Sequence, residues 1–252
     1  MTTKKLIRTL ELLMTSVILL LSLFGTYSFF TAPPKAKAAQ EEIERKLREN
    51  QERAEEMKRQ QMEKAAREEE ERKEQEQAGE EEKEYTDAAQ MHVVGIGDSV
   101  MLAALSQMYE TFPNGYFDAV FGRTIYDGMN ALNKLEEEGA LGDVIVFGLG
   151  TNCKIYEEDC EELIKHSGGR PTFWLSTYGV ENDSNVIMKN VIARHTNAYY
   201  IDWETLALEH QSAYISSDYL HPNEEGSYAF AELIREEITK ELCNYEQADP
   251  KR

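Results

Sequence analysis

From residue 91 onward, short apolar runs alternate with longer amphipathic stretches. Short apolar runs bounded by turn residues are typical of buried strands, and apolar positions spaced three and four apart are typical of helices. Strands that alternate with helices form a parallel sheet covered by helices on both faces. This pattern predicts a three-layer α/β sandwich with strands at 92–96, 117–121, 143–148, 171–176 and 198–201, and helices at 100–111, 125–138, 155–166, 184–195 and 223–242.

A longer apolar stretch lies near the start of the chain. Leu12–Phe30 contains 19 residues without a charge, which is long enough to cross a bilayer core of about 30 Å. Lys4, Lys5 and Arg8 precede it, so we expect a cytoplasmic N-terminus and an extracellular remainder. The stretch is longer than the apolar region of a usual signal peptide, which favours a single-pass signal-anchor over cleavage near Ala36–Ala38. Cleavage would give a secreted protein.

The segment that follows is dominated by charge, with 29 charged residues among the 44 of 41–84. Acids repeatedly stand four residues before bases, as in Glu41–Arg45, and this order stabilises a helix by about 0.2–0.5 kcal/mol per pair. We predict a charged helical spacer. A weak coiled-coil seam is the alternative, and its apolar positions are Ile43, Leu47, Ala54 and Met57, with Gln61 and Lys64 in its next places.

Composition changes sharply along the chain and predicts its organisation. The net charge is −20, and residues 91–245 hold 25 acids and nine bases, which is −16 of that total. A strongly acidic domain repels phosphate backbones, so we expect no nucleic-acid partner. The predicted segments are a cytoplasmic N-terminus (1–11), a transmembrane signal-anchor (12–30), a spacer (31–90), a globular domain (91–245) and a tail (246–252).

Polar residues with catalytic potential follow several of the predicted strands. The first strand leads into Gly97-Asp98-Ser99, the second into Gly122-Arg123 and the third into "GLGTNC", which contains Asn152. Asp218 and His221 stand before the last helix. Parallel sheets place their sites at the carboxyl ends of the strands, so we expect these residues to meet at one edge.

These residues form four ordered blocks that resemble the SGNH (GDSL-type) hydrolases over residues 91–243. The blocks are "GDSV", "FGR", "GTN" and "DYLH". The resemblance implies a flavodoxin-like sheet. More narrowly, "IGDSVMLAA", "FGRTIYDG", "GALGDVIVFGLGTN" and "YIDW" are similar to the extracytoplasmic domain of Gram-positive peptidoglycan O-acetyltransferases, which implies O-acetylated cell-wall glycan as the substrate.

The resemblance implies a role for each site residue. Ser99 is the expected nucleophile, His221 the base that takes its proton, and Asp218 the carboxylate that orients the imidazole. The expected oxyanion hole consists of the Ser99 and Gly122 N–H groups and the Asn152 side-chain amide. Each residue also has a structural alternative, because Ser99 and Asn152 could cap helices and the others could belong to turns. Asp98 is expected to be structural.

The sequence also departs from the pattern of these relatives. Many of them carry an acid after the asparagine, where this chain has Cys153. The multi-span acyltransferase that usually precedes such a domain is missing from this sequence, so acetyl transfer is expected to need a separate membrane partner. Hydrolysis needs only water, and esterase and O-acyltransferase activities both stay open. A non-catalytic glycan-binding or scaffold protein is the rival hypothesis.

The remaining candidates are weaker. Cys153 and Cys160 could pair outside the cell or stay as thiols. Trp203 and Tyr178 lie near predicted strand ends and could line a sugar subsite. The histidines outside the four blocks have no matching partners, and metal or nucleotide signatures are missing, so no cofactor is expected.

Overall fold

The computed structural model describes residues 41, 43–53, 55–56, 59–60 and 85–243. The predicted membrane span at 12–30, most of the spacer and the tail at 246–252 lie outside these residues. The described positions between 41 and 60 are helical, but they do not stand apart from the domain as a spacer would, because Asn50 Nδ2 donates to Leu102 O at 2.8 Å and Arg53 Nη1 donates to Ser106 Oγ at 2.9 Å. Within the described ranges, no helix combines the length and the apolar character that a bilayer crossing requires.

A parallel five-stranded sheet forms the centre of the domain, with the strand order β2-β1-β3-β4-β5. This is the flavodoxin-like order, so the predicted fold class is confirmed for the sheet. All four strand pairs are parallel. The strands are β1 (Val93–Gly97), β2 (Tyr116–Ala119), β3 (Val144–Gly148), β4 (Thr172–Leu175) and β5 (Ala198–Ile201).

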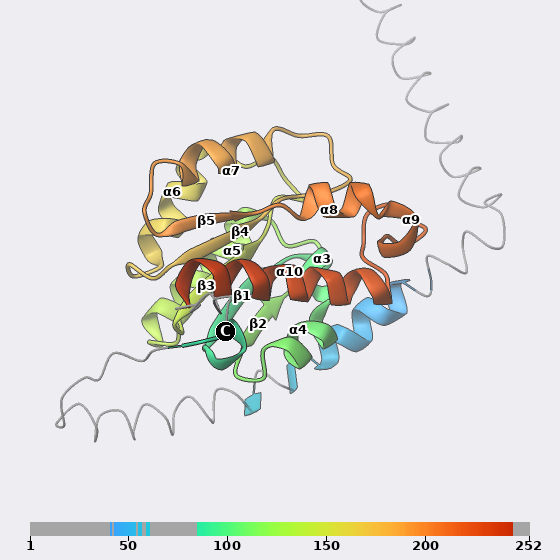
Figure 1. Ribbon diagram of the computed structural model, residues 1–252, viewed down its shortest axis with the longest axis horizontal. Coiled ribbons are helices and arrows are strands. Elements are labelled where there is room, and N and C mark those ends of the chain that lie inside the picture. The colour runs from blue at the N-terminus through green and yellow to red at the C-terminus, as the bar shows by residue number, and fades with distance from the viewer. Residues whose placement is uncertain (1–40, 42, 54, 57–58, 61–84, 244–252) are drawn as a thin grey trace, which may run out of the picture. The chain divides into compact units, whose positions relative to one another are not determined.

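Helices cover the sheet on both faces (Figure 1). Helices α5, α6 and α7 follow one another over one face, while α10 packs against α4, α8 and β5 on the other. The helical elements are η1 (Ala88–Gln90), α3 (Ser99–Ala103), α4 (Leu105–Thr111), α5 (Ile125–Glu137), α6 (Glu157–His166), α7 (Ser184–Ile192), α8 (Trp203–Glu209), α9 (Gln211–Tyr214) and α10 (Glu224–Leu242).

The core and the strand register fix the edge that carries the site. Alternate residues of β1 and β3 point into a buried cluster beneath α5, α6 and α7, with Phe147 against Trp174 at a ring distance of 4.6 Å. Gly97 of β1 pairs with Ala119 of β2 and with Gly148 of β3. Three neighbouring strands therefore end at the same level, and the loops that follow them start side by side.

Besides small shifts in element bounds, the structure differs from the predicted elements in several places. The helix expected at 100–111 is divided at Ala104, where the backbone (φ −89°, ψ 4°) leaves the helical range. The short helices α8 and α9 stand where no helix was predicted. Strand β2 ends at Ala119, two residues before the predicted end, and the chain turns at Gly122, where Arg123 N–H donates back to Val120 O.

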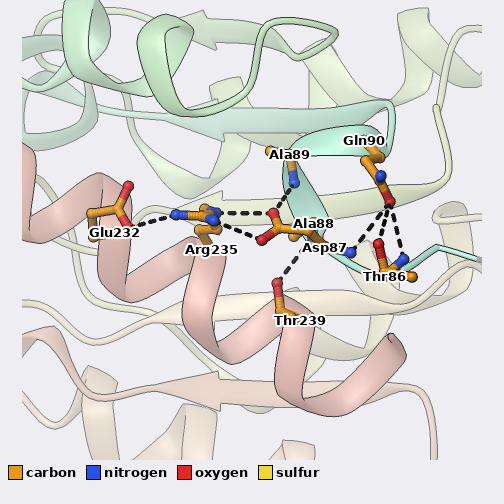
Figure 2. Close-up of polar contacts among 8 residues, drawn as sticks. All are labelled: Thr86, Asp87, Ala88, Ala89, Gln90, Glu232, Arg235 and Thr239. Atoms are coloured by element: carbon orange, nitrogen blue, oxygen red, sulfur yellow. Dashed lines mark hydrogen bonds and ion pairs between the residues drawn. The ribbon is translucent and has the colours of Figure 1, made fainter. Parts of the chain in front are cut away.

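Residues 85–90 attach firmly to the domain, although the sequence pattern placed them in the spacer. Arg235 of α10 donates from Nε to Asp87 Oδ1 at 2.9 Å and from Nη2 to Asp87 Oδ2 at 2.6 Å (Figure 2). Ala88 N–H donates to Thr239 Oγ1. The Asp87 side chain also caps η1 by accepting from Ala89 N–H. The Tyr85 hydroxyl donates to Asp143 at 2.8 Å. The start of the domain is thus fixed to its last helix.

We expect Arg235→Met to destabilise the domain by about 0.5–1 kcal/mol at pH 7, the upper range for a partly exposed ion pair. Arg235 holds the pKa of Asp87 below its ordinary value. The stabilisation is therefore present above the ordinary carboxyl pKa of about 4 and is lost as the pH falls through the lowered value. Urea unfolding of wild type and variant at several pH values measures this difference.

The control is Glu232→Gln, which removes only the outer partner of Arg235, a contact of 3.0 Å within one helix. We expect this change to cost less than Arg235→Met. A difference between wild type and Arg235→Met that persists unchanged at pH 3 would contradict the assignment to the Asp87 charge.

Candidate active site

Ser99 is the first residue of α3, and Asp98 alone separates it from the end of strand β1. Asp98, not Ser99, is the N-cap, because its side chain accepts from Val100 N–H at 2.9 Å. The helix-cap alternative for Ser99 is therefore wrong. A Cβ at Gly97 would lie 2.5 Å from Met101 Cβ, so only glycine lets α3 fold back this closely onto β1. Asp98 is 1% exposed, and this burial raises the pKa of its carboxyl group.

Asp218 and His221 lie in a tight loop between α9 and α10. The loop is closed by an antiparallel bridge between Ile215 and Pro222. Tyr219, between the two site residues, has φ +61°, a left-handed conformation that is uncommon outside glycine. This turn directs the Leu220 and His221 N–H groups back to Asp218 Oδ1, both at 3.1 Å.

A continuous hydrogen-bonded chain joins Asp218, His221 and Ser99. Asp218 Oδ2 lies 2.6 Å from His221 Nδ1, and His221 Nε2 lies 2.8 Å from Ser99 Oγ. Burial alone would raise the pKa of Asp218, but the His221 side chain and two backbone N–H groups hold it below its ordinary value. An ionised carboxylate only accepts, so Nδ1 carries the imidazole proton and Nε2 faces the serine hydroxyl as acceptor. This arrangement is able to deprotonate Ser99.

The three predicted oxyanion donors lie after the ends of three neighbouring strands, β1, β2 and β3. Gly122 is exposed with φ +71°, in the turn after β2. One N–H of the Asn152 amide donates to Arg123 O at 3.1 Å. Throughout the part of the chain that the structure describes, the backbone N–H groups of Ser99 and Gly122 and the second amide N–H of Asn152 have no protein acceptor. These donors are free to bind a developing negative charge.

Sequence reasoning assigned no role to Arg123, although the "FGR" block contains it. Its guanidinium is buried and paired with Asp118, and its carbonyl accepts from Asn152. The sequence feature that could have pointed to Arg123 is an arginine beside a turn glycine in a strongly acidic domain. That feature does not distinguish a surface cation from a buried one.

The predicted sugar subsite of Trp203 and Tyr178 is wrong, because the two side chains are only 1% and 5% exposed. Trp203 packs edge-on against Phe230, and the Tyr178 hydroxyl accepts a hydrogen bond from Gln211. Proximity to a strand end does not fix which way a side chain points. The exposed aromatic residues beside site residues are Phe121, next to Gly122, and Tyr219.

The cysteines are thiols in this structure. Cys153, Cys160 and Cys243 are all free, so the pairing of Cys153 with Cys160 that the sequence left open is not made. Cys153 Sγ, at the position where many relatives carry an acid, accepts from Ile125 N–H at 3.5 Å. Burial raises the pKa of Cys160 to about 12, which keeps this thiol protonated.

The strand order, the four blocks and the hydrogen-bonded Ser99, His221 and Asp218 are together similar to those of SGNH-type hydrolases and acyltransferases. Among curated proteins, the chain is 25% identical over 150 residues to the peptidoglycan O-acetyltransferase OatA of Listeria monocytogenes. It is 26% identical over 144 residues to the O-acetyltransferase OatA of Staphylococcus aureus. The matches cover 58% and 55% of this chain but only 24% of each relative, so the chain spans about a quarter of their length.

A solved structure has the same fold. The C-terminal catalytic domain of Streptococcus pneumoniae peptidoglycan O-acetyltransferase A superposes with a TM-score of 0.54 at 18% identity, covering 60% of this chain and 93% of that domain. No protein-family model matches the chain.

Proposed function

We propose that this protein is an extracytoplasmic serine esterase or O-acetyltransferase that handles O-acetyl groups of cell-wall glycan through an acyl-enzyme on Ser99. The observation that carries the proposal is the pair of hydrogen bonds that link Asp218 to His221 and His221 to Ser99 Oγ. The predicted oxyanion donors have N–H groups with no acceptor among the described residues. This is the arrangement that nucleophilic acyl transfer requires.

The proposed reaction has two halves. Ser99 Oγ attacks the acetyl carbonyl while His221 Nε2 takes its proton, and the oxyanion accepts from Ser99 N–H, Gly122 N–H and Asn152 Nδ2. Collapse breaks the ester bond, and the leaving alkoxide takes the proton from His221. The acetyl group is then attacked by water or by a sugar hydroxyl, whose proton passes to His221; the bond from the acetyl carbon to Ser99 Oγ breaks, and Ser99 Oγ takes that proton from His221.

The proposed substrate follows from the names of the relatives, which are peptidoglycan O-acetyltransferases. An uncharged acetyl ester on a glycan is compatible with a domain of strong net negative charge. Phe121 and Tyr219 are 59% and 68% exposed beside Gly122 and His221, and they offer aromatic faces for a sugar ring. Transfer requires an acetyl donor, which we assign to a separate multi-span membrane acyltransferase. We place the protein at the cell membrane, with Leu12–Phe30 as its single span.

The test supplies the full chain, purified in mild detergent, with p-nitrophenyl acetate and chitooligosaccharide acceptors. We expect acetylated oligosaccharides by mass spectrometry, and none with Ser99→Ala. Free acetate alone would assign the esterase branch of the proposal. No acetyl product above the Ser99→Ala background would overturn it in favour of a scaffold or glycan-binding protein.

A further inference from the structure

Arg123 is a buried cation directly behind the turn that carries Gly122. Its side chain is 8% exposed, and Nη2 lies 2.9 Å from Asp118 Oδ1. Nη1 donates to the main-chain carbonyl of Asp118 and, at 3.4 Å, to that of Gly97. Burial of a guanidinium is unfavourable unless its charge is paired and its N–H groups are bonded. These partners therefore determine where Arg123 can lie.

The contacts of Arg123 reach the three loops that supply the oxyanion donors. Gly97 precedes the Asp98-Ser99 turn by one residue, and Gly122 is bonded directly to Arg123 in the chain. The Arg123 carbonyl accepts from Asn152 Nδ2 at 3.1 Å. A single residue thus connects the loops that follow β1, β2 and β3.

The capping box between Thr124 and Asp127 fixes the chain after the turn, but Gly122 itself has little support from packing. Gly122 is exposed, and a Cβ built there would meet no atom within 4 Å, so packing does not hold it. The neighbouring Phe121 is exposed as well. The backbone hydrogen bonds here are Val120 N–H to Gly97 O at 3.1 Å and Arg123 N–H to Val120 O at 3.3 Å. The Arg123 side chain is the buried anchor of this turn.

We propose that Arg123, with Asp118 as its counter-ion, is a positioning residue that holds Gly122 and Asn152 in place beside Ser99 for oxyanion binding. The inference rests on the proposed acyl-transfer function. Oxyanion donors act only when they are held about 3 Å from the charge that develops in the transition state. Loss of the anchor therefore lowers kcat for a small ester and leaves KM nearly unchanged.

Three variants of the full chain test this with p-nitrophenyl acetate. Arg123→Met removes the positive charge and keeps an unbranched aliphatic side chain. We expect kcat to fall about 10²-fold or more, as for loss of one oxyanion donor. Arg123→Lys restores the charge without the planar fork and recovers part of that loss. The matched control is Arg170→Met, at the end of the sheet where the strands begin. Arg170 Nε donates to Gly142 O there at 2.7 Å. Its kcat stays within about threefold of wild type.

A double-mutant cycle separates positioning from general structural damage. If Arg123 acts through Asn152, the loss in Arg123→Met/Asn152→Ala falls short of the product of the two single losses by about tenfold or more. The proposal would be overturned if the loss of kcat in the double variant equalled the product of the two single losses. It would also be overturned by a kcat for Arg123→Met within about threefold of wild type.

Amide hydrogen exchange over residues 120–124 gives a readout that needs no turnover. We expect faster exchange there in Arg123→Met and in the milder Asp118→Asn, but not in Arg170→Met. Unchanged exchange in both site variants would overturn the anchoring role. If wild type hydrolyses the ester no faster than Ser99→Ala, the proposed function fails, while exchange still decides whether Arg123 holds the turn.

Discussion

Ser99→Ala is expected to reduce kcat for hydrolysis of p-nitrophenyl acetate by about 10³-fold or more. Ser99 Oγ lies 2.8 Å from His221 Nε2, and alanine leaves this nitrogen with no hydroxyl to deprotonate. Steady-state rates with the full chain in detergent measure the loss. Ser99 is 3% exposed, so a lost hydroxyl leaves little free space and the fold is expected to persist.

The matched control is Ser212→Ala in the exposed helix α9, which removes a hydroxyl away from the site. We expect wild-type rates from it. Methanesulfonyl fluoride provides a second readout, because it should add one methylsulfonyl group to wild type and to Ser212→Ala but none to Ser99→Ala. Equal labelling of Ser99→Ala and wild type would contradict Ser99 as the nucleophile.

Asp218→Asn is expected to lower kcat by about 10⁴-fold, the loss typical of this change in a Ser-His-Asp triad. The carboxylate accepts from the imidazole and from two backbone N–H groups. An asparagine that turns its NH₂ group toward His221 Nδ1 stabilises the tautomer with the proton on Nε2, which is unable to take a proton from Ser99. Rates at pH 7 and circular dichroism together separate lost chemistry from lost fold.

Asp183→Asn is the control for this change, since Asp183 is exposed and its side chain caps no helix. Its kcat should equal that of wild type. A kcat for Asp218→Asn within about tenfold of wild type would contradict the orienting role of Asp218 and leave His221 acting without it.

The sequence was sufficient to predict the sheet and the convergence of the site residues. Ser99, Gly122 and Asn152 each follow a short apolar run. Parallel strands bring such positions together at the carboxyl ends of the strands, whatever the lengths of the loops. His221 meets Ser99 from 122 residues away, which only the order of the blocks indicated. The roles of these residues stay predictions until the variants are measured.

Side-chain direction could not be read from the sequence in the same way. Trp203 and Arg123 both lie just beyond strand ends, and both are buried in the structure. Their burial depends on partners distant in sequence or on local turns, such as Phe230 for Trp203 and Asp118 for Arg123. The break at Ala104 carries no glycine or proline to mark it. Periodicity therefore predicted the elements better than the surroundings of single residues.

Residues 85–90 and the end of α10 meet at the end of the sheet where the strands begin, opposite the predicted catalytic residues. Ala88 is bonded to Thr239, one turn before the end of α10, and the glycine turn at Gly168-Gly169 lies at that same end of the sheet, before β4. A short peptide can join the end of α10 to residue 85, and the chain can be opened between Gly168 and Gly169. The resulting circular permutant leaves the loops that carry Ser99, Gly122 and Asn152 intact. The polarity of the sheet thus leaves one side of the domain available for re-engineering while the other side retains the chemistry.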